Sequence, residues 1–296
     1  MRITPGMTSD NALYNLQKGR TLLNRLQEQI ASGSLINRPS DDPITTRQLL
    51  DMDSKLDSGE QYLSNITKGN LSLSLTDTAL QGMADIIAQV KKTAGAITSG
   101  SSDQTVRENA ASQLEELKKQ LVDLGNTQLG DQFIFAGFKN STPPFSMANN
   151  DYSGTSDELT IEIDRNSPAG ITIAGDALLK GTGSYGGVDM LETLDKIITA
   201  IRDNIPADIQ ENAKLLDSSA NQINNARSDV AGRMIRFKSA ETMISRNQST
   251  LQGIVSDTMG VDYIKAATEL TQQQASFEAA LSATAKITQL SLLDYL

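Results

Sequence analysis

The chain has 296 residues, a formal net charge of −10 at pH 7, and only 4% aromatic residues. The acidic balance disfavours nucleic acid as a partner, and the scarcity of large side chains favours thin helical bundles over a thick globular core. Because the chain contains no Cys and no His, disulfides, Cys nucleophiles and a Ser-His-Asp triad are excluded, and we expect no catalytic, cofactor-binding or metal site.

The sequence predicts no membrane insertion. No stretch reaches the roughly 18 consecutive apolar residues of a membrane-spanning helix, and the first ten residues lack the apolar core of a signal peptide. We therefore expect a chain that is soluble when made and that leaves the cell, if it does, without a cleaved signal.

The first predicted helix covers 8–32 and carries one apolar stripe. Its members recur at steps of four and three, which places them on one side of an α-helix. They are Ala12, Leu16, Gly19, Leu23, Leu26 and Ile30. Gly33 suits the left-handed cap that ends a helix.

The next helix start is predicted at Asp41-Asp42-Pro43, where Asp42 can cap and Pro43 suits the first helical position. Capping explains these carboxylates better than acid–base chemistry or cation binding does. An apolar stripe then predicts one long helix over 43–98. Asn70 and Asp77 interrupt this stripe, either to fix the register with a partner helix or because they face solvent.

A helix over 103–128 is expected to return antiparallel to the long helix. The paired lysines on these two helices are predicted to lie on solvated faces. They are Lys91-Lys92 and Lys118-Lys119.

The segment 134–187 has a different, β-rich pattern. Leu159, Ile161 and Ile163 alternate with polar residues and predict a strand, with 171–173 as its hairpin partner. The run 133–138 is interpreted as a buried strand, with an exposed binding patch as the alternative. Because so small an insert buries little surface alone, we expect it to rest on the end of the helical bundle.

The segment Gly181–Gly186 matches the pattern G-x-G-x-x-G. A dinucleotide site would need this loop inside a parallel βαβ unit. No such unit is predicted, so a flexible link between the insert and the bundle is the favoured interpretation.

Helices are predicted over 188–202, from Pro206 to 255, and over 262–292. The stripe of the second long helix contains Arg227 and Glu241, which either form a buried pair or mark the edge of the stripe with their charges at solvent. The last helix carries its own stripe at alternating steps of four and three. Its members are Tyr263, Ala267, Leu270, Gln274, Phe277, Leu281 and Thr284.

A helix at a chain terminus has no neighbouring sequence to cover its stripe. It must dock on the other terminus, dock on another subunit, or stay disordered, which makes assembly the first hypothesis. The residues expected to carry self-assembly are Leu16, Leu23, Leu26, Ile30, Leu270, Phe277 and Leu281.

The predicted fold is mainly α, a long antiparallel helical bundle or coiled-coil rod with paired terminal helices and a small β-rich head. Residues 1–42 and 256–296 would form the terminal pair. Residues 43–132 and 188–255 would form the middle bundle, and 133–187 the head.

Two motifs resemble those of bacterial flagellins and their relatives. The segment Arg38-Pro39-Ser40-Asp41-Asp42-Pro43 is similar to that of the hook–filament junction proteins of this family. The second motif, Gln132–Phe138 with Phe133, Phe135 and Gly137, also resembles the junction proteins. The chain end, Ser291–Leu296, is similar to theirs as well.

The resemblance implies a structural subunit of the flagellum, secreted by type III export to the hook–filament junction. Implied partners are copies of itself in a ring, the adjacent hook-associated junction protein, flagellin, and a cytoplasmic export chaperone that binds the C-terminal region. The alternatives are a flagellin filament subunit, an injection-apparatus tip protein, and a dinucleotide-binding enzyme.

Overall fold

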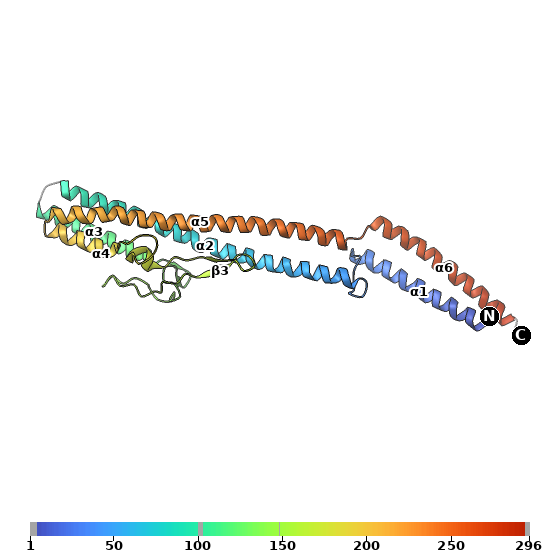
Figure 1. Cartoon of the computed structure of the whole chain (residues 1–296). Coiled ribbons are helices and arrows are strands. Elements are labelled where there is room, and N and C mark those ends of the chain that lie inside the picture. The colour runs from blue at the N-terminus through green and yellow to red at the C-terminus, as the bar shows by residue number, and fades with distance from the viewer. Residues whose placement is uncertain (1–4, 100–102, 148, 294–296) are drawn as a thin grey trace. The chain divides into compact units, whose positions relative to one another are not determined.

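A computed structural model of the chain describes residues 5–99, 103–147 and 149–293, and the fold is mainly helical (Figure 1). Its α-helices are α1 (Pro5–Ser32), α2 (Pro43–Ser99), α3 (Gln104–Gly125), α4 (Met190–Arg202), α5 (Pro206–Met259) and α6 (Tyr263–Leu293). The structure confirms each of the predicted helices, and the observed ends lie within about one turn of the predicted ones. Among the described residues, no helix is both long and apolar enough to cross a bilayer.

The chain divides into two compact units whose boundaries fall inside α2 and α5. Unit 1 comprises Met1–Ser58 and Arg246–Leu296, and unit 2 comprises Gly59–Ser245. Unit 1 therefore holds α1, α6, the start of α2 and the end of α5. Unit 2 holds the remainder of the two long helices together with α3, α4 and the β-rich insert.

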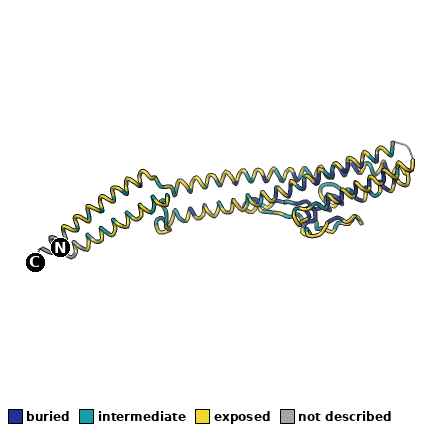
Figure 2. Tube along the Cα trace, turned by 180° about the vertical axis from the view of Figure 1, so that it is seen from behind, coloured by how far each residue is buried: buried dark blue, intermediate teal, exposed yellow. Residues whose placement is uncertain are grey.

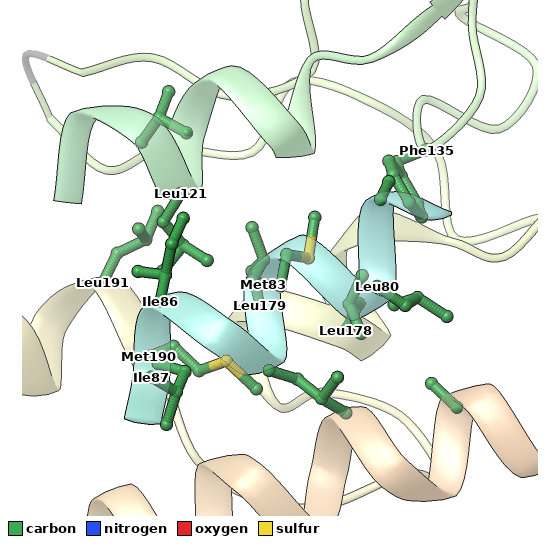
Figure 3. Close-up of a cluster of buried hydrophobic side chains, with 14 of the residues drawn as sticks. Leu80, Met83, Ile86, Ile87, Leu121, Phe135, Leu178, Leu179, Met190 and Leu191 are labelled. Carbon is green, nitrogen blue, oxygen red and sulfur yellow. The ribbon is translucent and has the colours of Figure 1, made fainter. Parts of the chain in front are cut away.

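The hydrophobic core of the chain lies in unit 2, where α2, α3, α4 and α5 meet. Leu80, Met83 and Ile87 follow one another at steps of three and four along α2 and are buried. Figure 3 shows them together with Leu121 of α3 and Leu191 of α4. Full burial of each such side chain contributes about 1.5–3 kcal/mol, so this cluster is the main source of stability in unit 2.

Polar residues on the stripes of the two long helices pair with each other. Arg227 of α5 lies 3.0 Å from the Asp77 carboxylate of α2, and Lys91 also pairs with Asp217 across the same two helices. Asp77 and Arg227 are both half-buried. Of the two alternatives for Asp77, the structure therefore supports a residue that fixes register.

The prediction of solvated lysines was wrong for Lys118. Its side chain is buried, and its ammonium group lies 2.6 Å from the carboxylate of Asp195 on α4. Lys119, Lys91 and Lys92 are exposed, as expected. The reason is that α4 packs along α3 and supplies a carboxylate at this height, which the local sequence around Lys118 does not reveal.

Two short antiparallel hairpins form the β-rich insert. β1 (Gln128–Leu129) pairs with β2 (Gln132–Phe133), and β3 (Thr160–Glu162) pairs with β4 (Pro168–Gly170). The strand at 160–162 and its hairpin are confirmed, but the predicted partner 171–173 was wrong, because β4 begins at Pro168 and ends at Gly170. The reason is a tight turn closed by a hydrogen bond from the Ser167 amide to the Asp164 carbonyl, after which pairing starts at once.

The prediction that the insert rests on the end of the bundle was wrong. The insert packs along the flank of the bundle instead. The Asn65 amide donates to the Glu162 carbonyl at 2.9 Å, and the Ser72 hydroxyl donates to the Ile171 carbonyl at 2.9 Å. The physical reason is a difference in helix length. Because α3 and α4 are much shorter than α2 and α5, they leave a side of the long pair uncovered, and the insert covers it (Figure 1).

Arg233 of α5 joins the insert to the bundle. Its guanidinium donates to the Thr172 carbonyl at 3.0 Å and pairs with Glu158 at 2.8 Å and with Asp229 at 2.7 Å. Burial alone would lower the pKa of Arg233. The hydrogen bonds and charges of Glu158 and Asp229 outweigh burial, so the pKa of Arg233 is raised. Burial also raises the pKa of Tyr185, whose hydroxyl donates to Asp229 at 2.7 Å.

The segment Gly181–Gly186 is an ordered turn, so the prediction of a flexible link was wrong. It follows a short π-helix, η1 (Asp176–Lys180), and Gly181 has a φ of +68°. The buried amide of Gln222 on α5 donates to the Leu178 carbonyl at 2.6 Å and to the Val188 carbonyl at 3.0 Å. A side chain on Gly186 would lie 2.9 Å from Gln222 Cβ, so close packing on α5 requires glycine there.

Gly69 of α2 permits a close approach of the insert to the long helices. A Cβ there would lie 2.8 Å from Ile161 Cδ1 and closer still to the Phe237 ring. We expect Gly69→Ala to destabilise unit 2 by about 1–3 kcal/mol through overpacking, measured by urea unfolding followed by circular dichroism. The matched control is Gly95→Ala on the same helix, where nothing lies within 4 Å. It should stabilise by up to about 1 kcal/mol through helix propensity, and equal effects of the two substitutions would contradict this account.

Arg233→Ala should loosen the insert from the bundle. The change leaves the Glu158 and Asp229 carboxylates without their shared cation, at an expected cost of about 1–3 kcal/mol. We expect limited proteolysis to cleave within 134–187 faster than in the unsubstituted chain. Arg236→Ala, which removes an exposed side chain that donates to the Ser167 hydroxyl and the Pro168 carbonyl, should change the cleavage rate much less.

Candidate assembly surface

The terminal helices α1 and α6 pack antiparallel along each other in unit 1 (Figure 1). Gly19 of α1 lies against the Phe277 ring of α6, where a Cβ would stand 3.2 Å from Phe277 Cδ2. Gly33 at the other end lies beside Tyr263, whose hydroxyl would stand 2.7 Å from a Cβ. The glycine within the α1 stripe is therefore a place where a ring of the partner helix fits.

The breaks between α1 and α2 and between α5 and α6 lie side by side and are bonded to each other. Gly33 ends α1 with a φ of +72°, which confirms the predicted left-handed cap. The Leu35 amide then donates to the Met259 carbonyl at 2.8 Å, and the Val261 amide donates to the Gly33 carbonyl at 3.3 Å.

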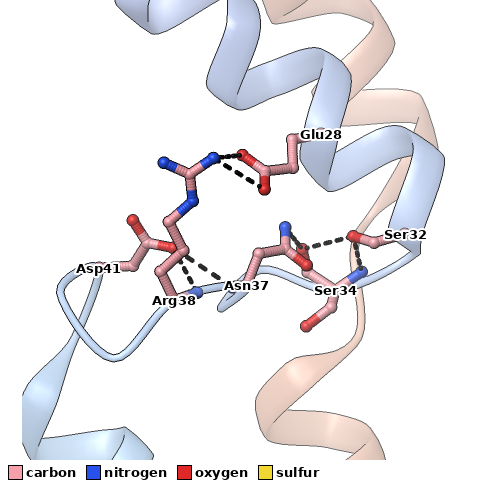
Figure 4. Close-up of polar contacts among 6 residues, drawn as sticks. All are labelled: Glu28, Ser32, Ser34, Asn37, Arg38 and Asp41. Atoms are coloured by element: carbon pink, nitrogen blue, oxygen red, sulfur yellow. Dashed lines mark hydrogen bonds and ion pairs between the residues drawn. The ribbon is translucent and has the colours of Figure 1, made fainter.

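The loop between α1 and α2 is organised by Asp41 (Figure 4). Its carboxylate accepts hydrogen bonds from the backbone amides of Asn37 at 3.2 Å and Arg38 at 3.0 Å. The Arg38 guanidinium lies 3.2 Å from the Glu28 carboxylate of α1, and both side chains are largely exposed. Such a pair contributes less than about 1 kcal/mol, so the loop depends more on Asp41 and on the hydrogen bonds that Gln29, Ser34 and Asn37 donate to its carbonyl groups.

Asp42 caps α2, as predicted. Its carboxylate accepts hydrogen bonds from the amides of Ile44 at 3.1 Å and Thr45 at 3.0 Å and from the Thr45 hydroxyl at 2.7 Å. The Thr45 hydroxyl, followed by the Thr45 amide, lowers the pKa of Asp42. Pro43 is the first residue of α2, where its missing amide hydrogen costs nothing. Pro39 and Ser40 are exposed within the loop.

Unit 1 has almost no core. Among its described residues, the buried hydrophobic side chains are Leu26, Leu49 and Ala266. Of the residues expected to carry self-assembly, Leu26 is buried, Leu281 is exposed, and the others are half-buried. Those half-buried residues are Leu16, Leu23, Ile30, Leu270 and Phe277. Figure 2 shows the resulting contrast, with dark blue confined almost wholly to unit 2.

α6 contacts α1 through a face that differs from its apolar stripe. Leu270, Phe277 and Thr284 belong to both the stripe and the contact face. The face continues through Ala266, Gln273 and Ala280, whereas the stripe continues through residues that the structure leaves exposed, namely Tyr263, Ala267, Gln274 and Leu281. The hydrophobic pattern could not choose between the two, because each contains alanine and glutamine beside the shared Leu270 and Phe277.

The second family motif lies in unit 2 and belongs to its packing. Phe133 and Phe135 are buried, which supports the buried interpretation of this run, although Phe138 is exposed. Gly137 has a φ of +61°, and a Cβ there would lie 2.8 Å from the Asp157 carbonyl oxygen. The two motifs thus stabilise different units.

Unit 1 instead exposes many large apolar side chains. Those exposed on α1 and α6 are Met7, Leu13, Tyr14, Leu22, Tyr263, Ile264 and Leu281, and Ile44 and Leu50 of α2 join them. Exposed apolar residues in such number mark interaction surfaces. Among the described residues, no group of acidic side chains is placed to hold a metal ion. The arrangement therefore suits binding of further helices.

Comparison with known families matches both ends of the chain to flagellins. Residues 3–140 match the bacterial flagellin N-terminal helical region, and residues 213–296 match the bacterial flagellin C-terminal helical region. Together these matches span about three quarters of the chain.

Individual relatives agree with this result. Flagellar hook-associated protein 3 of Escherichia coli is 23% identical over 99% of each chain, and that of Salmonella typhimurium is 22% identical over 99% of each chain. The solved structure of Bacillus cereus FlgL matches with a TM-score of 0.61 and 17% identity, over 70% of this chain and 99% of that one. The flagellar junction protein FlgL of Legionella pneumophila matches with a TM-score of 0.58 and 15% identity, over 73% and 100%. At these identities the two structures support the fold alone.

The isolated chain should be cut by proteases in α1 and α6 before it is cut in unit 2, because helices without a buried core open locally at low cost. We expect early cleavage within about the first and last 40 residues, with a fragment close to 59–245 persisting. Mass spectrometry of the fragments identifies the cut sites. Terminal helices as resistant as unit 2 would contradict this expectation.

Proposed function

Because the chain belongs to the bacterial flagellin family, we propose that it is a structural subunit of the flagellum that joins the hook to the flagellin filament. The observation that carries the proposal is the terminal helix pair, which packs along one face and leaves large apolar side chains exposed on both helices. Relatives that match over nearly the full length are hook-associated proteins, which favours the junction over the filament.

The proposed mechanism couples ordering to assembly. The self-assembly residues of α1 and α6 hold the pair together weakly, and neighbouring subunits complete the burial. Ordering the helices costs conformational entropy, which the added contacts must offset. A monomer in solution would thus stay unassembled until it meets a preformed hook end.

The proposed sections of the subunit follow the same plan. Residues 1–42 and 256–296 would form the inner tube, 43–132 and 188–255 the middle section, and 133–187 the outer head. The partners would be copies of the chain in a ring, the adjacent hook-associated junction protein and flagellin. An export chaperone would bind the exposed stripe of the C-terminal region before secretion.

Two alternatives receive less support. A flagellin subunit would polymerise alone, whereas a junction subunit should need a preformed hook end. A dinucleotide-binding enzyme would need an open glycine loop, whereas Gly186 packs directly against Gln222 of α5, which also bonds to the residues on either side of the segment Gly181–Gly186. Nicotinamide binding detected by calorimetry would favour the enzyme.

Leu281→Asp should abolish filament attachment, because it places a charge on the exposed apolar stripe of α6 that neighbours would cover. The circular dichroism and unfolding of unit 2 should not change. Immunogold labelling and filament counts in cells that carry the variant measure the effect. Leu71→Asp, at an exposed position of α2 in unit 2, is the matched control and should retain filaments. Normal motility with Leu281→Asp, or wild-type protein located away from flagella, would overturn the proposal.

A further inference from the structure

The terminal pair has two exposed sides, and the two sides differ in chemistry. On α1, Lys18, Leu22 and Arg25 follow one another at steps of four and three and are all exposed. On α6, Gln274, Glu278 and Leu281 have the same spacing and are also exposed. These two sets are named the Leu22 face and the Leu281 face.

Helix geometry places the two faces on opposite sides of the pair. At 100° per residue, the Leu22 face lies about a third of a turn before the stripe of α1, and the Leu281 face lies about a quarter turn after the contact face of α6. Because the helices are antiparallel, a backward rotation on α1 and a forward rotation on α6 run in the same sense when both are seen from one end, and the two contact faces from which they start look toward each other. The faces therefore point away from each other, and neither can be covered by the other within one chain.

The faces also lie at the same height along the pair. Gly19 lies against Phe277, so the neighbouring residues Lys18 and Glu278 are level with each other on opposite sides. In the part of the chain that the structure describes, no ion pair involves Lys18, Arg25 or Glu278. Both faces thus offer charge and apolar surface to a neighbour.

We propose that the Leu281 face of one copy docks on the Leu22 face of the next, head to tail; this inference rests on the proposed function and names the contact between subunits. Glu278 then meets Lys18 and Arg25 of the neighbour, while the exposed Leu22 and Leu281 side chains become covered. A contact between two different faces repeats from copy to copy and generates a ring or a helical array, unlike a contact between identical faces.

Charge selects this arrangement over the direct stacking of α1 on α1. Arg20 points to the side of α1 opposite the Leu22 face, so such stacking would bring Arg20 against Lys18 and Arg25 of the neighbour. Like charges in an interface disfavour association and exclude wrong registers. Placing α6 on α1 instead brings opposite charges together.

Cysteine cross-linking in assembled flagella tests the proposal, because the chain has no cysteine of its own. The double variant Leu22→Cys with Leu281→Cys should give a ladder of multimers on oxidation of isolated hook–filament preparations. The control Leu22→Cys with Ala279→Cys, which moves one cysteine to the outer side of α6, should give no ladder. Each single variant should stay monomeric.

Other outcomes would overturn the head-to-tail contact. Dimers of the single Leu281→Cys variant would show identical faces meeting, and an equal ladder in the control would show non-specific capture. A chain that is present on flagella but forms no ladder would overturn this inference and leave the junction role intact. Absence of the wild-type chain from flagella would overturn both.

Charge exchange provides a second test, which does not depend on oxidation. Glu278→Lys alone, and Lys18→Glu with Arg25→Glu, should each cause loss of filaments from the hook. Combining all three changes in one chain should restore the filaments, because the opposite charges meet again between copies. Failure of the combined variant to restore filaments, with unit 2 still folded, would contradict the pairing of these charges.

Discussion

The packing of α2 along α5 is the contact on which the rest of unit 2 depends. These helices are far longer than α3 and α4; their buried apolar residues belong to one core cluster, and the Asp77–Arg227 pair joins them at its edge. Once they are aligned, the short helices cover one part of their length and the insert covers another. At Gly69 the insert packs directly against α2. The insert is therefore part of the packing of the bundle, even though its own strands are very short.

Most of the fold could be predicted from the sequence, because helical periodicity and capping chemistry are local. Asp42, Pro43 and Gly33 marked helix ends through interactions within a few residues of themselves. Apart from the position of the β4 strand, which a local turn decides, the errors concerned contacts distant in sequence. Lys118 is buried because Asp195 lies across from it, and the turn at Gly181–Gly186 is ordered because Gln222 bonds to its flanks.

The assembly surface was predicted in outline and missed in detail. On α1 the apolar stripe and the contact face are the same, because all six stripe residues are buried or half-buried where α6 packs. On α6 the contact includes Gln273 and two alanines, whereas the stripe contains Gln274 and a different alanine, and part of the stripe stays uncovered. Where a helix packs against more than one neighbour, its apolar stripe contains residues from every contact. The stripe alone does not show which residue belongs to which neighbour.

The paired breaks in unit 1 have a mechanical consequence. Both continuous paths of helical hydrogen bonds stop at one level, where a few backbone bonds around Gly33 and Gly260 connect the loops. A helix resists bending along its length, whereas a joint between helix ends resists it much less. Torque or tension applied along α1 and α6 would therefore deform unit 1 first at this level, which makes the joint a defined point of compliance.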